Sequence, residues 1–187
     1  MGRLKVPLIL ITITLITSSL DADDWPHWRG PSATGVSSET GLPTEWSENE
    51  NVAWKSRIRG LGISSPIVSG NYVFVTSQVG SGDSRPGPRL FQSGDAGAQG
   101  EIALGRGTKP GREGDVSFLV TALDRVSGSR IWGYELQAEG SLHSVHEKHN
   151  LASPSPVTDG ESVYAFFGNG QIIGLNMDGT LLWKRHL

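Results

Sequence analysis

The chain of 187 residues contains no cysteine. This absence excludes disulfide bonds, thiolate metal sites, cysteine nucleophiles and a lipid-anchored cysteine. Charge is also sparse: 16 Lys and Arg residues oppose 19 Asp and Glu residues, so the net charge is −3. A weakly acidic chain lacks the basic surface that indicates nucleic-acid binding, so we expect no nucleic-acid partner.

The apolar stretch near the N-terminus, residues 6–16, is too short for a membrane-spanning helix, which needs about 20 residues. Two basic residues precede it, and small polar and then acidic residues follow. This order is typical of a secretory signal peptide, although a buried N-terminal strand is an alternative. We expect residues 1–22 to be the signal peptide, cleaved after Ser19 or Ala22, and the protein to be periplasmic or extracellular, without a membrane span.

Turn-forming residues are abundant, with 25 Gly and 10 Pro. Both are unfavourable in helix interiors, so the composition favours short strands joined by many turns. The sequence also repeats. SSPIVSGNYVFVTS, from Ser64, matches SPSPVTDGESVYAFF, from Ser153, and ALDRVSGSRIW, from Ala122, matches GLNMDGTLLW, from Gly174. The recurring residues are Gly70 and Gly160, Gly128 and Gly179, and Trp132 and Trp183.

A four-stranded unit with one Trp per copy and a period near 40–50 residues is typical of a β-propeller blade. One blade cannot bury both of its faces, so blades stack around an axis, and a Trp is large enough to fill the gap between two of them. We predict an all-β, incomplete β-propeller with about two four-stranded antiparallel blades plus one outer strand. The recurring Gly and Trp residues, together with Trp54, are expected to dock one blade on the next.

These motifs resemble the pyrroloquinoline-quinone-type, or tryptophan-docking, β-propeller repeat. The segment DWPHWRGPSATGVSSETGLPTEW, from Asp24, resembles the N-terminal segment of exported bacterial proteins with that repeat. The resemblance implies a ring of seven or eight blades and a family that includes quinoprotein dehydrogenases and an outer-membrane assembly lipoprotein. We expect residues 23–50 to form a tether and residues 51–187 a partial propeller.

The partial propeller is expected to have three parts. Residues 51–58 would form the closing outer strand, residues 64–136 one blade and residues 153–187 the next. Because propellers have about 4–8 blades, two blades cannot close a ring. We therefore expect a fragment or truncated product of a longer protein, with ring closure by several chains as the alternative.

Two loops are candidates for function. Residues 77–117 are expected to be an insertion between the second and third strands of the first blade. Loops longer than about 12–15 residues are usually functional or disordered, so this one is either a partner-binding lid or a mobile surface loop.

The second candidate loop, SLHSVHEKHN, links the two blades. It carries three histidines, His143, His146 and His149. With Glu147 they could bind zinc or another divalent ion, if a helical turn gathered them on one side. The alternative is a structural loop in which Asn150 and Ser153 hydrogen-bond to backbone groups at the start of the next strand.

The sequence shows neither a Ser-His-Asp order nor a nucleophile elbow. We expect a non-enzymatic binding or assembly scaffold that binds a protein or a glycan through its loop-rich face, without a cofactor. The resemblance implies one alternative, a fragment of a quinoprotein oxidoreductase that binds pyrroloquinoline quinone only in a longer parent protein. Such enzymes typically use Ca²⁺ and adjacent cysteines, and this chain has no cysteine. The histidine loop as a divalent-metal site is the other alternative.

Overall fold

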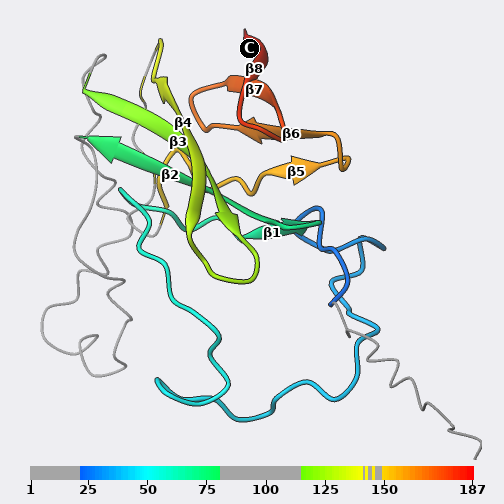
Figure 1. Ribbon diagram of the computed structural model, residues 1–187. Helices are drawn as coiled ribbons and strands as arrows, with labels where there is room; N and C mark the ends of the chain where they lie inside the picture. The colour runs from blue at the N-terminus through cyan, green and yellow to red at the C-terminus, as the bar shows by residue number, and fades with distance from the viewer. Residues whose placement is uncertain (1–21, 81–114, 141, 143–144, 146–148) are drawn as a thin grey trace, which may run out of the picture.

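The computed structural model describes residues 22–80, 115–140, 142, 145 and 149–187. In these ranges the chain forms eight β-strands and no helix. The strands are antiparallel and make two four-stranded sheets, ordered β1-β2-β3-β4 and β5-β6-β7-β8 (Figure 1). The prediction of an all-β fold with two four-stranded blades is thus confirmed. Nothing in the described part of the chain forms a helix that could span a bilayer.

Each sheet is an up-and-down meander whose strands are joined by tight turns, except that the insertion separates β2 from β3 in the first sheet. The first contains β1 (Ile67–Ser69), β2 (Tyr72–Gly80), β3 (Val116–Asp124) and β4 (Arg130–Gln137). The second contains β5 (Val157–Thr158), β6 (Ser162–Phe166), β7 (Gln171–Asn176) and β8 (Leu181–His186). The turn positions Gly128 and Gly179 have φ values of 69° and 88°, a conformation that glycine adopts without steric cost.

The strands beside the insertion are longer than the sequence indicated. β2 and β3 remain paired to Gly80↔Val116, so the expected bounds 77–117 are too wide at both ends. The polar residues Ser77 and Gln78 resemble a loop, but both are buried in the sheet. The Ser77 hydroxyl donates to the Arg59 carbonyl at 2.8 Å, and the Gln78 backbone pairs with Leu61. These partners replace the water that a loop residue would bind.

Residues 51–58 lie outside both sheets. None of the eight strands pairs with this segment, so the structure forms no strand there. The outer strand of a blade pairs with the third strand of the same blade, and both described sheets already have their four strands. The expected closing role of residues 51–58 therefore stays a prediction. The segment nevertheless contacts the first sheet through Trp54.

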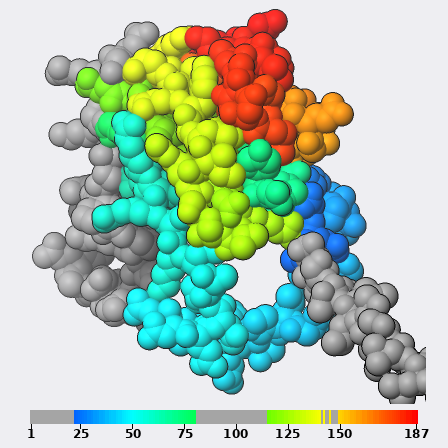
Figure 2. Space-filling view, viewed as in Figure 1, coloured from blue at the N-terminus to red at the C-terminus, as the bar shows by residue number. Residues whose placement is uncertain are grey.

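The core lies between the two sheets. The first sheet contributes Phe74, Phe118, Val120 and Ala122, and the second contributes Val163, Ala165, Ile173 and Leu175. Phe167, in the β6–β7 turn, also belongs to this core. The rings of Phe118 and Phe167 stack across the interface with centroids 4.3 Å apart. Figure 2 shows the two sheets in contact, the first coloured green to yellow and the second orange to red.

Both sheets contain an equivalent row of four residues, one from each strand and paired across the sheet. This row is largely buried in the first sheet and partly exposed in the second. In the first sheet it is Ile67, Phe74, Ala122 and Trp132, and in the second it is Val157, Tyr164, Gly174 and Trp183. Ile67 and Phe74 are fully buried beneath the second sheet, whereas Val157 is 41% exposed and Trp183 is 37% exposed. We call the second row, together with the exposed Phe166, the open face.

Candidate functional site

Trp132 on β4 joins the two sheets through its side chain. Its indole N–H donates a 2.9 Å hydrogen bond to the Met177 carbonyl in the β7–β8 turn. Its ring lies against Gly179, where an added Cβ would come within 2.6 Å of a ring atom. This turn therefore requires glycine for two reasons, because of its positive φ and because of the ring beside it.

Trp54 repeats this arrangement on the first sheet. Its indole N–H donates to the Arg125 carbonyl at 2.9 Å, and an added Cβ on Gly128 would lie 2.4 Å from its ring. The Ser56 hydroxyl also donates to the Gly128 carbonyl. The β3–β4 and β7–β8 turns are thus equivalent docking positions for a tryptophan.

Trp183 on β8 has no such turn beside it. Its ring lies over Gly174 of its own sheet and stacks with Tyr164, with centroids 6.0 Å apart. Among the residues that the structure describes, none accepts a hydrogen bond from its indole N–H. Gly70 and Gly160 have positive φ values in the β1–β2 and β5–β6 turns, and neither would place an added Cβ within 4 Å of another atom.

The end of the loop between the sheets is held by polar side chains. The Asn150 side chain accepts from the Ala152 amide at 2.8 Å and donates to the Leu61 carbonyl at 3.3 Å. The Ser153 hydroxyl donates to the Asn150 carbonyl at 2.6 Å and accepts from its amide at 3.0 Å. Asn150 and Ser153 thus bond to backbone groups, as expected, but within residues 150–152 and at Leu61 rather than at the start of β5.

Two residues that the sequence analysis missed hold the same segment. The buried Thr76 hydroxyl lies 3.1 Å from the carbonyl oxygens of both Ala152 and Pro154, placed to donate to either. The buried Gln78 side chain accepts from the Leu151 amide at 2.9 Å. A signal was present, since both polar residues continue a strand whose neighbours are β-branched or aromatic.

The candidate metal ligands fall mostly outside the described residues. His143 and His146 lie outside them, as do residues 81–114 of the insertion, and only His149 is described. Within the described ranges, no group of three or more His, Asp or Glu side chains is placed to hold a metal ion. Metal binding by the histidine loop stays a prediction.

Three of the four carboxyl groups with a lowered pKa lie in turns, and the fourth, Glu135, lies on β4. The pKa of Asp124 is lowered by hydrogen bonds from the Ser127 hydroxyl and amide. The Tyr164 hydroxyl, 2.8 Å away, is the main cause that lowers the pKa of Asp159, and Thr180 lowers that of Asp178. These bonds favour the ionised carboxylate, whereas a general acid near neutral pH needs a raised pKa. The three aspartates therefore act as turn caps.

A cavity of about 350 Å³ lies between residues 55–59 and the first sheet. Its charged lining residues are Lys55, Arg57, Arg59 and Arg130. No lining residue is acidic, and Ser56, Ser127 and Ser129 add hydroxyl groups. Arg59 is paired with Glu135 at 2.7 Å, and this pairing lowers the pKa of Glu135. Cations and hydroxyls are the partners that anionic groups require.

Residues 22–26, which we call the N-terminal clasp, tie the first strands of both sheets together. Trp25 pairs with Val68 of β1, and the Pro26 carbonyl accepts from the Thr158 amide of β5 at 2.9 Å. In Figure 1 this segment, coloured blue, lies beside β1.

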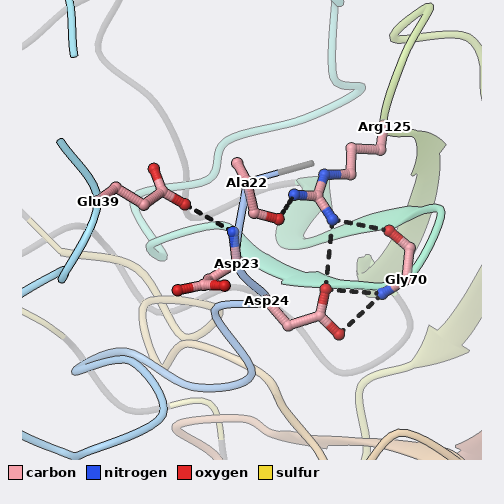
Figure 3. Close-up of polar contacts among 6 residues, drawn as sticks. All are labelled: Ala22, Asp23, Asp24, Glu39, Gly70 and Arg125. Atoms are coloured by element: carbon pink, nitrogen blue, oxygen red, sulfur yellow. Dashed lines mark hydrogen bonds and ion pairs between the residues drawn. The ribbon is translucent and has the colours of Figure 1, made fainter. Parts of the chain in front are cut away.

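An ion pair fastens the clasp to two turns of the first sheet (Figure 3). Both Asp24 carboxylate oxygens lie 3.0 Å from the Gly70 amide, and Arg125 approaches Asp24 at 3.3 Å. Arg125 also donates to the Gly70 carbonyl at 3.1 Å and to the Ala22 carbonyl. No local pattern pairs residues that are 101 positions apart, so the sequence analysis missed Arg125.

Comparison with known proteins identifies one relationship. A family model described as outer membrane protein assembly factor BamB matches residues 32–187, a range that includes the Trp54 segment and both sheets. No curated protein matches the chain.

Proposed function

This chain belongs to the family of pyrroloquinoline-quinone-type β-propeller repeat proteins, and from that premise we propose that it is an exported, non-enzymatic scaffold for a protein partner. The observation that carries the proposal is the match over residues 32–187 to the model of an outer-membrane assembly factor. A fold by itself does not define a function, so the proposal also depends on how this chain uses its polar side chains.

The polar side chains of the described residues mainly stabilise turns and the contact between the two sheets. The aspartates with lowered pKa values cap turns, and Asn150, Thr76 and Gln78 bond to backbone groups between the sheets. A quinone enzyme would need carboxylates free to hold Ca²⁺ and to act as a base. The described residues offer no such cluster, and the chain has no cysteine; both observations support a role without this cofactor.

The partner surface that we infer is the edge where the long loops leave the sheets. Gly80, Val116 and Gln137 meet at this edge, because β3 pairs with both β2 and β4 there. The cationic cavity is lined by Arg130 at one end and Arg59 at the other. The Arg59 end lies close to this edge, because the Ser77 hydroxyl of β2 donates to the Arg59 carbonyl. Charge complementarity then favours an acidic segment of the partner.

The test is affinity capture of cross-linked periplasmic proteins by the full chain. We expect the double variant Arg57→Glu and Arg130→Glu to lose the partner, and Arg185→Glu, a charge reversal on β8, to retain it. Equal capture by both variants would exclude the cavity from the interface. Oxidation of alcohols or sugars by the full-length protein after addition of pyrroloquinoline quinone and Ca²⁺ would contradict the non-enzymatic role, and dependence on a glycan would replace the protein partner.

A further inference from the structure

The N-terminal clasp lies at the boundary of the expected leader. We propose that the Ala22–Asp23 peptide bond is the signal-peptide cleavage site, and that the α-ammonium group created on Asp23 forms an ion pair with Glu39. The inference rests on the proposed export of the protein. Water adds across the bond, so that Ala22 leaves with a carboxylate and the Asp23 nitrogen becomes a protonated amine.

The Asp23 nitrogen already faces a carboxylate. It donates to Glu39 Oε1 at 2.6 Å (Figure 3). In addition, Ser38 Oγ lies 3.4 Å from the Asp23 side chain. An amide offers one proton and no charge, whereas an ammonium offers three protons and a full positive charge. A charge-assisted hydrogen bond is about twice as strong as a neutral one. Cleavage therefore strengthens a contact that the chain already makes.

The charges around this nitrogen favour a new cation. The carboxylates of Asp23, Asp24 and Glu39 gather around the clasp, and Arg125 is the cation that the structure places among them. Like charges at short range repel, and an added positive charge reduces that repulsion. Arg125 gives up its bond to the Ala22 carbonyl on cleavage, but it keeps those to Asp24 and Gly70.

The geometry also discriminates between the two cleavage sites that the sequence left open. Ser19 and Ala22 both provide the small residue that signal peptidases require before the scissile bond. Cleavage after Ser19 would place the amine on Leu20, three residues before Asp23. Only cleavage after Ala22 places it at Glu39, and the mature chain then begins within the clasp.

The first experiment determines the N-terminus of the full chain after export in a bacterial host, by intact mass and N-terminal sequencing. We expect Asp23 to be the first residue. A chain that begins at Leu20 overturns this inference and leaves the scaffold function intact. A chain that retains residues 1–22 overturns both the inference and the proposed export.

The second experiment tests the ion pair in the mature protein. An ammonium paired with Glu39 is less often the free amine, so acylation of the α-amino group near pH 7, followed in the tryptic peptide 23–29, is slowed. We expect Glu39→Gln to accelerate this acylation about two- to fivefold, the range that corresponds to an exposed ion pair. Glu45→Gln, in an exposed residue of the same segment, should match the wild type. Equal rates for wild type and Glu39→Gln would overturn the pairing.

Discussion

At the scale of single residues, the two strand tryptophans show how one residue type takes two environments. Trp132 lies against Gly179 and donates to the Met177 carbonyl, so it joins two sheets. Trp183 holds the equivalent repeat position and lies on its own sheet beside Tyr164. The difference arises because, of these two tryptophans, the structure places a glycine turn of another sheet beside Trp132 and not beside Trp183.

We predict that Trp132→Phe lowers the free energy of unfolding by about 1–3 kcal/mol, because it leaves the Met177 carbonyl without its donor. Trp183→Phe should change it by less than about 0.5 kcal/mol, since a partly exposed side chain is altered without loss of a described hydrogen bond. Urea denaturation of the full chain measures both. Equal losses would show that the indole hydrogen bond contributes nothing.

The turn glycines provide a second comparison. Gly179 and Gly160 have φ values of 88° and 91°, so Ala is strained at both, by about 1–2 kcal/mol. Only Gly179 has a tryptophan ring within contact distance of an added Cβ. We predict that Gly179→Ala destabilises more than Gly160→Ala in urea denaturation. The excess should vanish in a Trp132→Ala background, and its persistence there would contradict the role of the ring.

At the scale of elements, three turns depend on ionised aspartates. The lowered pKa values of Asp124, Asp159 and Asp178 mean that the folded state favours their charged forms. The resulting stabilisation is present above the unfolded pKa of about 3.9 and is lost as the pH falls through the lower folded values. We predict a melting temperature that declines below about pH 4, and a shallower decline for Asp159→Asn. Parallel curves for the two proteins would contradict this.

Strand β2 also holds the segment that leads into the second sheet. The buried Thr76 hydroxyl faces the carbonyls of Ala152 and Pro154, and a valine of the same shape leaves them unpaired. We predict that Thr76→Val lowers the free energy of unfolding by about 1–3 kcal/mol, whereas Thr76→Ser, which keeps the hydroxyl, costs less. Urea denaturation distinguishes them. A valine variant as stable as wild type would show that these carbonyls need no donor.

At the scale of the whole molecule, the open face is an exposed apolar surface. The equivalent row in the first sheet is largely buried beneath the second sheet. Exposed apolar sheet faces promote association, so we predict that the chain self-associates with rising concentration. Phe166→Lys, on the open face, should shift sedimentation toward the monomer. Ile131→Lys, a similarly exposed residue on β4, should not. A monomeric, cooperatively melting wild type would contradict the prediction.

The fold was largely predictable because its signals are local. Turn glycines such as Gly128 and Gly179 and the runs of β-branched residues between them located the turns and strands to within a few residues. The prediction was wrong at Ser77 and Gln78, because the partners that hold them in β2 come from residues 59–61 rather than from neighbours in the chain. Polarity alone does not reveal that a strand continues.

What the sequence determined by itself is the repeating unit: four strands, their turns, and a tryptophan at the same place in each copy. These follow from short-range preferences, which a single copy already contains. Tertiary structure decided which row of each sheet is covered, which turn receives a tryptophan, and that Asp24 meets Arg125. Those outcomes depend on which surfaces come together in space, and residues far apart in the chain carry no periodic pattern that records their contact.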